Sequence, residues 1–160
     1  MSPITRSWIA LAAVGAGLIH LALVLSAPPL GAVLLAGIGI VEFAWGVLVM
    51  FDERFLVPRI AVVAALAPVA LWIAALLLGV DAFRPLPLAA ATLLELFIAI
   101  TIAVVQRRGR TAEAPSTRRY VVGLLAGVLV VGIVTGPALG ATEAGRQVID
   151  PTVFGTGVHH

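Results

Sequence analysis

The sequence contains no cysteine and no lysine, and only 11% of its 160 residues are charged. Without cysteine the chain forms no disulfide, thiolate metal site or iron–sulfur cluster of its own. A water-soluble domain has about 25% charged and roughly 45–50% apolar residues, whereas 61% of this chain is hydrophobic. Because a fold of this size cannot hide so much apolar surface from water, we expect lipid to be its solvent.

Familiar catalytic motifs are also missing. The chain has no phosphate-binding loop, no G-x-S-x-G nucleophile elbow and no H-E-x-x-H pair. Its many glycines lie inside apolar stretches, where no phosphate group could sit. The sequence therefore favours a protein without catalytic residues, predicts no nucleic-acid partner and identifies no cofactor.

The apolar residues are arranged in long runs. A helix needs about 20 apolar residues to cross the hydrocarbon core of a bilayer. We expect an all-α, polytopic integral membrane protein, in which a bundle of five transmembrane helices forms one domain over residues 1–140. The predicted spans are residues 8–25, 30–51, 58–80, 86–105 and 120–139.

The arginines predict the orientation of this bundle, because cytoplasmic loops carry an excess of basic residues. With the N-terminus inside the cell, eight arginines lie on the cytoplasmic side and only Arg84 and Arg146 lie on the other. We therefore expect the N-terminus inside and the C-terminus outside. The eight are Arg6, Arg54, Arg59, Arg107, Arg108, Arg110, Arg118 and Arg119.

Residues 141–160 differ from the rest, with mixed polarity and nothing long enough to span a membrane. We expect an extended extracytoplasmic tail that is ordered only when a partner holds it, because it has too little apolar surface to offset chain entropy. The tail ends in His159 and His160, which could capture Cu(II) or Zn(II). A remnant of an expression tag would give the same ending.

The last predicted span carries glycines four residues apart. Small residues at this spacing let helix backbones approach closely in lipid. They predict a tight helix–helix contact, made either within this chain or with another membrane subunit. The glycines are Gly123, Gly127, Gly132, Gly136 and Gly140.

Three ionisable residues lie deep inside predicted spans: His20, Glu42 and Glu95. A charged side chain at the bilayer centre costs at least about 2.5–3.5 kcal/mol, so such residues face the bundle interior, pair or stay neutral. Glu42 and Glu95 stand 53 residues apart, as do Arg6 and Arg59, which suggests two copies of one helical hairpin. The three could bind protons, a cation or a divalent metal. They could equally hold the bundle together by hydrogen bonds of about 1 kcal/mol.

The stretch GLIHL at residues 17–21, followed by a short loop and a helix bearing Glu42, resembles small multi-pass membrane proteins of high-GC bacteria. The first two spans are also similar to DoxX-like four-helix proteins, from which the fifth span and the tail depart. The resemblance implies a bacterial inner (cytoplasmic) membrane location and no particular chemistry.

Two functions follow as expectations. The first is a non-catalytic accessory or structural subunit of a larger bacterial membrane complex, or a homo-oligomer, docking through the glycine-rich fifth helix and the outer tail. The alternative is a small proton-coupled carrier, or a metal- or haem-binding membrane protein, that uses Glu42, Glu95 and His20.

Overall fold

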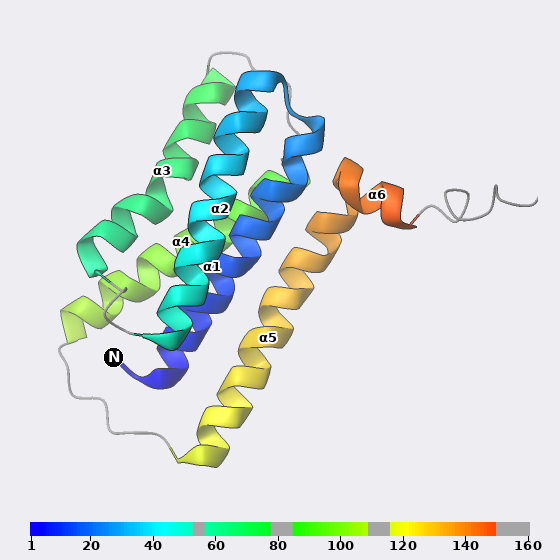
Figure 1. Cartoon of the computed structure of the whole chain (residues 1–160). Coiled ribbons are helices and arrows are strands. Elements are labelled where there is room, and N and C mark those ends of the chain that lie inside the picture. The colour runs from blue at the N-terminus through cyan, green and yellow to red at the C-terminus, as the bar shows by residue number, and fades with distance from the viewer. Residues whose placement is uncertain (53–56, 78–84, 109–115, 150–160) are drawn as a thin grey trace, which may run out of the picture.

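The computed structural model describes residues 1–52, 57–77, 85–108 and 116–149, and all regular structure in these ranges is helical. Five of its helices are long and apolar enough to cross a membrane, which confirms the predicted all-helical fold and makes this a multi-pass membrane protein. They are α1 (Pro3–Leu23), α2 (Pro29–Phe51), α3 (Pro58–Leu77), α4 (Pro85–Arg108) and α5 (Thr117–Gly140) (Figure 1).

Proline marks where these helices begin. Helices α1, α2, α3 and α4 all start at a proline, whose missing N–H costs nothing in the first turn and whose fixed φ suits the helix. At the start of α1 the Ser2 side chain also accepts a hydrogen bond from the Thr5 backbone N–H at 3.1 Å. A 3-10 turn, η1 (Val24–Ser26), ends the first span and leads into α2.

Helix α1 lies at the centre of the bundle, with α2, α4 and α5 packed around it (Figure 1). In the apolar 18-residue stretch of this first span, 56% is buried inside the structure, a larger share than in any other described span. The reason is a run of small residues, including Ala12, Ala13 and Ala16, that lets neighbours approach on several sides.

Helices α1 and α2 approach one another closely, and glycine makes this possible. A Cβ atom on Gly17 would lie 2.8 Å from the carbonyl oxygen of Gly39, and one on Gly46 would lie 2.8 Å from that of Ala10. These two contacts fix the register of the antiparallel pair, because sliding either helix would bring a larger side chain against the opposite backbone.

Helix α5 packs on α1 through the first half of its glycine series. Gly123 makes room for the side chain of Ile4 and Gly127 for the indole of Trp8, which donates a hydrogen bond to the Gly123 carbonyl at 2.8 Å. By contrast, a Cβ on Gly132 or Gly136 would meet no described atom within 4 Å. The second half of the series therefore makes no close contact within the described chain, and its predicted role in docking stays a prediction.

The expectation of an extended tail is wrong for its first part. Residues Glu143–Ile149 form a short helix, α6, that contacts α5, α1 and η1. The buried Thr142 begins it: its hydroxyl donates to the Leu139 carbonyl at 2.6 Å and accepts from the Gly145 N–H at 3.1 Å. Gly140 ends α5, with its Cα close to Gly145 of α6. His159 and His160 lie outside the described residues.

The packing of α1 on α2 gives a paired test. We expect Gly39→Ala to lower the free energy of unfolding by about 1–3 kcal/mol, because the new methyl group would press on the α1 backbone. Gly37→Ala, on the same helix, should leave it nearly unchanged, since a Cβ there meets nothing within 4 Å. Unfolding in mixed micelles would measure both, and equal effects would contradict the tight α1–α2 contact.

Candidate functional site

Three helices bring their ionisable side chains to one point inside the bundle. His20 of α1, Glu42 of α2 and Glu95 of α4 each offer a nitrogen or oxygen atom, and these atoms all lie within 4.8 Å of one another. The Nδ1 atom of His20 lies 2.7 Å from Oε2 of Glu42, and its Nε2 atom lies 3.6 Å from Oε1 of Glu95. The imidazole is thus placed between two carboxyl groups; we call these residues the His–Glu–Glu cluster.

The glycine contact explains why His20 meets Glu42. A helical side chain leans toward the N-terminus of its own helix. His20 follows Gly17 by about one turn and Glu42 follows Gly39 by about one turn, so in an antiparallel pair both side chains lean back to the level where Gly17 and Gly39 touch. The register set by the small residues therefore places the imidazole against the carboxylate.

Glu95 completes the cluster from α4, which packs on the other side of α1. Its side chain is only 2% exposed, and its Oε1 atom has no hydrogen-bond partner in the described structure. Burying a carboxyl oxygen without a partner is costly. A proton or a cation bound at this position would satisfy the atom in place.

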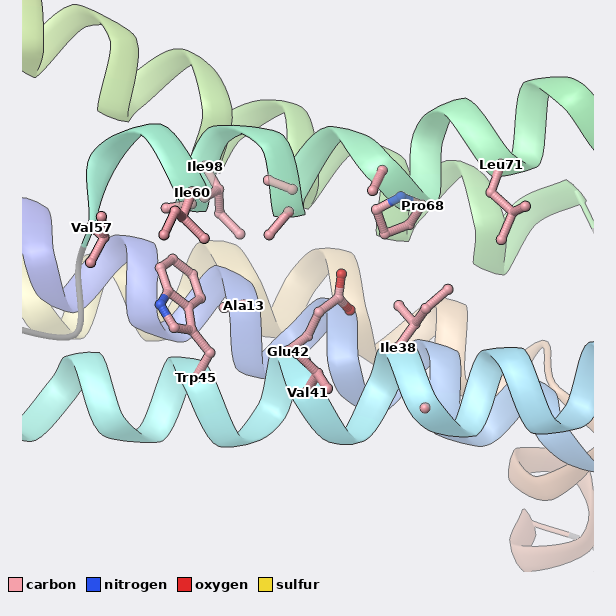
Figure 2. Close-up of a pocket in the computed structure, with 15 residues that line it drawn as sticks. Ala13, Ile38, Val41, Glu42, Trp45, Val57, Ile60, Pro68, Leu71 and Ile98 are labelled. Carbon is pink, nitrogen blue, oxygen red and sulfur yellow. The ribbon is translucent and has the colours of Figure 1, made fainter.

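The three side chains differ in access. Those of His20 and Glu95 are 4% and 2% exposed, whereas that of Glu42 is 15% exposed. Glu42 lines a cavity of about 630 Å³, and Figure 2 shows its carboxyl group projecting from α2 toward α3. Glu42 is therefore the member of the cluster that also lines this cavity.

The formal charge of the cluster depends on bound protons. A neutral imidazole with two carboxylates carries −2, so two protons bring the cluster to zero. A net charge in the low-dielectric interior is strongly unfavourable unless it is compensated. The cluster can thus hold protons, and any cation that binds there must displace them to keep it neutral.

A metal ion is a second chemical possibility for these residues. Zinc bonds of about 2.0–2.2 Å would suit the 3.6 Å gap between His20 Nε2 and Glu95 Oε1. However, Glu42 holds Nδ1, where it would orient the imidazole rather than bind the same ion. Haem fits less well, because each ring nitrogen of the buried His20 faces a carboxyl group and neither is open to an iron.

The sequence named all three cluster residues as candidates, and the structure places them together. It did not indicate the cavity, nor the role of Gly39 and Gly46 in close packing. The available signal was that these two glycines lie on the same face of α2 as Glu42.

No protein-family model matches this chain, no curated protein is significantly similar to it, and no solved structure significantly matches its fold. The likeness to DoxX-like proteins therefore stays a prediction.

Removing one member of the cluster should destabilise the protein more than removing all three. We expect His20→Leu to lower the free energy of unfolding by about 3–5 kcal/mol, because it leaves two buried acids without their common partner. The triple variant His20→Leu, Glu42→Leu, Glu95→Leu should regain most of that loss, since apolar replacement of a whole buried ionic group is often neutral. Unfolding in mixed micelles checks both, and a triple variant no more stable than the single one would count against a coupled cluster.

Proposed function

We propose that this protein is a small proton-coupled membrane carrier whose proton-binding site is the His–Glu–Glu cluster. The observation that supports this most directly is the imidazole of His20 lying between carboxyl groups from two other helices, deep in the bundle. A proton can pass between groups so arranged, from Glu42 at the cavity to Glu95 in the interior, through the two ring nitrogens.

A purely structural role explains the cluster less well. An interhelical hydrogen bond contributes roughly 1 kcal/mol in a membrane, and the pair His20–Glu42 already supplies one. Glu95 adds a second buried carboxyl group, and its Oε1 atom lacks a hydrogen-bond partner in the described structure, which is costly for a residue that only holds helices together. Ionisable residues retained at such cost inside spans are typical of proton and ion pathways.

The proposal includes the orientation and location expected from the sequence. Eight of the ten arginines lie near the start of the first span, around the connection between the second and third spans, or around that between the fourth and fifth. This excess favours an N-terminus in the cytoplasm. In a bacterial cytoplasmic membrane, the proton gradient would then supply the driving force for a carrier of this kind.

Carbodiimide labelling tests the proton site directly. Dicyclohexylcarbodiimide is an apolar reagent that modifies protonated carboxyl groups, and the cavity gives it a route to Glu42. We expect it to modify Glu42 in the purified protein, as shown by mass spectrometry of peptides, and Glu42→Gln to abolish the labelling. Glu143, a more exposed carboxylate on α6, is the matched control: it should stay unlabelled, and Glu143→Gln should leave the labelling of Glu42 intact.

Folded protein in which Glu42 does not react would contradict the proposal. Equal reaction at Glu143 would do the same, because the reagent would then be reporting exposure and not a proton held by the cluster.

A second candidate function has one observation in its favour. Gly132 and Gly136 lie on a face of α5 that makes no close contact in the described chain, beside the exposed Leu129 and Ile133. This face could receive a helix of another subunit, as an accessory subunit of a larger membrane complex requires.

Two substitutions on α5 separate folding from docking. We expect Gly132→Leu to leave the monomer folded, because the side chain enters open space, while Gly127→Leu disrupts the contact with Trp8 and lowers stability. If α5 docks to a partner, Gly132→Leu should remove that partner when the protein is extracted from native membranes in mild detergent. Retention of every co-purifying subunit in the Gly132→Leu variant would argue against this role.

A further inference from the structure

A cavity separates α2 from α3 at the level of the His–Glu–Glu cluster. Its volume is about 630 Å³, within the range of roughly 300–1,000 Å³ that is usual for small-molecule sites. Helices α2 and α3 form its walls, while Ala13 of α1 and Ile98 of α4 contribute from behind (Figure 2). The cavity is therefore large enough for an organic molecule and reaches the cluster at Glu42.

The mouth of this cavity opens sideways. Two of its lining residues, Val41 of α2 and Ile60 of α3, are 65% and 66% exposed. Both belong to helices long and apolar enough to span a bilayer, so we expect their exposed apolar side chains to face lipid. A ligand that uses this mouth enters from the lipid and must itself be apolar over most of its surface.

The polar groups of the cavity favour a positive charge. Among the described lining residues Glu42 is the one ionisable group, and Trp45, about one turn further along α2, also projects from α2 toward α3 (Figure 2). A carboxylate attracts an organic cation directly, and an indole on the same cavity wall can attract a large cation through its ring face. On the opposite wall Pro68 has no N–H to donate to the Ala64 carbonyl, so α3 adds an acceptor and no donor there.

We propose that this cavity binds a lipophilic organic cation, which enters from the bilayer between α2 and α3 and pairs its positive charge with the Glu42 carboxylate. The proposal rests on the function proposed above, since it identifies the substrate class of the same carrier. A hydrated metal ion finds no shell of oxygen ligands in these walls, and a neutral lipid gains nothing from Glu42.

Binding of such a cation is coupled to proton release by charge balance. The groups that face Glu42 are His20 from α1 and Glu95 from α4, and the described lining residues of α3 include no ionisable side chain. A monovalent cation entering a neutral cluster replaces one proton, which leaves for the solvent while the cation keeps its charge. No bond in the ligand is made or broken.

Tetraphenylphosphonium is a suitable probe, because it is a lipophilic cation with no proton of its own. Its binding to the purified full-length protein would be measured by calorimetry, and proton release by an indicator dye in weak buffer. We expect saturable binding with about one proton released per cation, and Glu42→Gln should lower the affinity at least about tenfold and abolish the release. Ala64→Phe should lower affinity by filling the cavity, whereas Ala70→Phe, an exposed alanine of α3 outside the lining, should not.

Each result has a distinct meaning. Equal affinity in the wild type, Glu42→Gln and Ala64→Phe would overturn the cation site, because the probe would then be dissolving in the micelle. No binding to a wild-type protein whose Glu42 still reacts with the carbodiimide would also overturn it, yet leave the proton site standing. Absence of both binding and carbodiimide reaction would defeat the inference and the proposed function together.

Discussion

Three ionisable side chains are removed from water in the middle of an apolar bundle, and they have chiefly one another as partners. His20 bonds to Glu42 on one side of its ring and faces Glu95 on the other. Since a lone charge in this setting is costly, the helices that carry these residues must be held in one register. The central place of α1, which packs on both α2 and α4, is consistent with this constraint.

Small residues fix that register by close backbone packing, without polar side chains. Gly17 against Gly39 and Gly46 against Ala10 bring two backbones into contact, and the lean of helical side chains then aims His20 at Glu42. On the other side of α2 the packing is open, and the cavity toward α3 reaches Glu42. The same carboxyl group therefore belongs both to the buried cluster and to a space that lipid-soluble molecules can enter. Because Glu42 belongs to both, binding of a ligand in the cavity can be coupled to release of a proton from the cluster.

Much of this architecture can be predicted from the sequence, because the length and polarity of a span are local properties. Five apolar runs predict five helices. His20, Glu42 and Glu95 stand out because placing an ionisable side chain inside a membrane span is energetically costly. That the three meet could not be predicted, since it depends on the register and tilt of three helices far apart in the chain. The glycines of α5 show the same limit: spacing alone does not distinguish Gly127, which packs on Trp8, from Gly132, which meets nothing. The prediction of an extended tail was wrong for another reason. The hydrogen bonds by which Thr142 begins α6 form only where α5 ends beside it.

The most direct test of the account is nitrogen NMR of the His20 ring, in protein labelled at histidine with His159 and His160 replaced by alanine. We predict two ring signals that respond separately: Glu42→Gln should shift mainly Nδ1, and Glu95→Gln should shift mainly Nε2. Ring signals that respond to neither substitution would contradict this prediction, because His20 would then not lie between the two carboxyl groups.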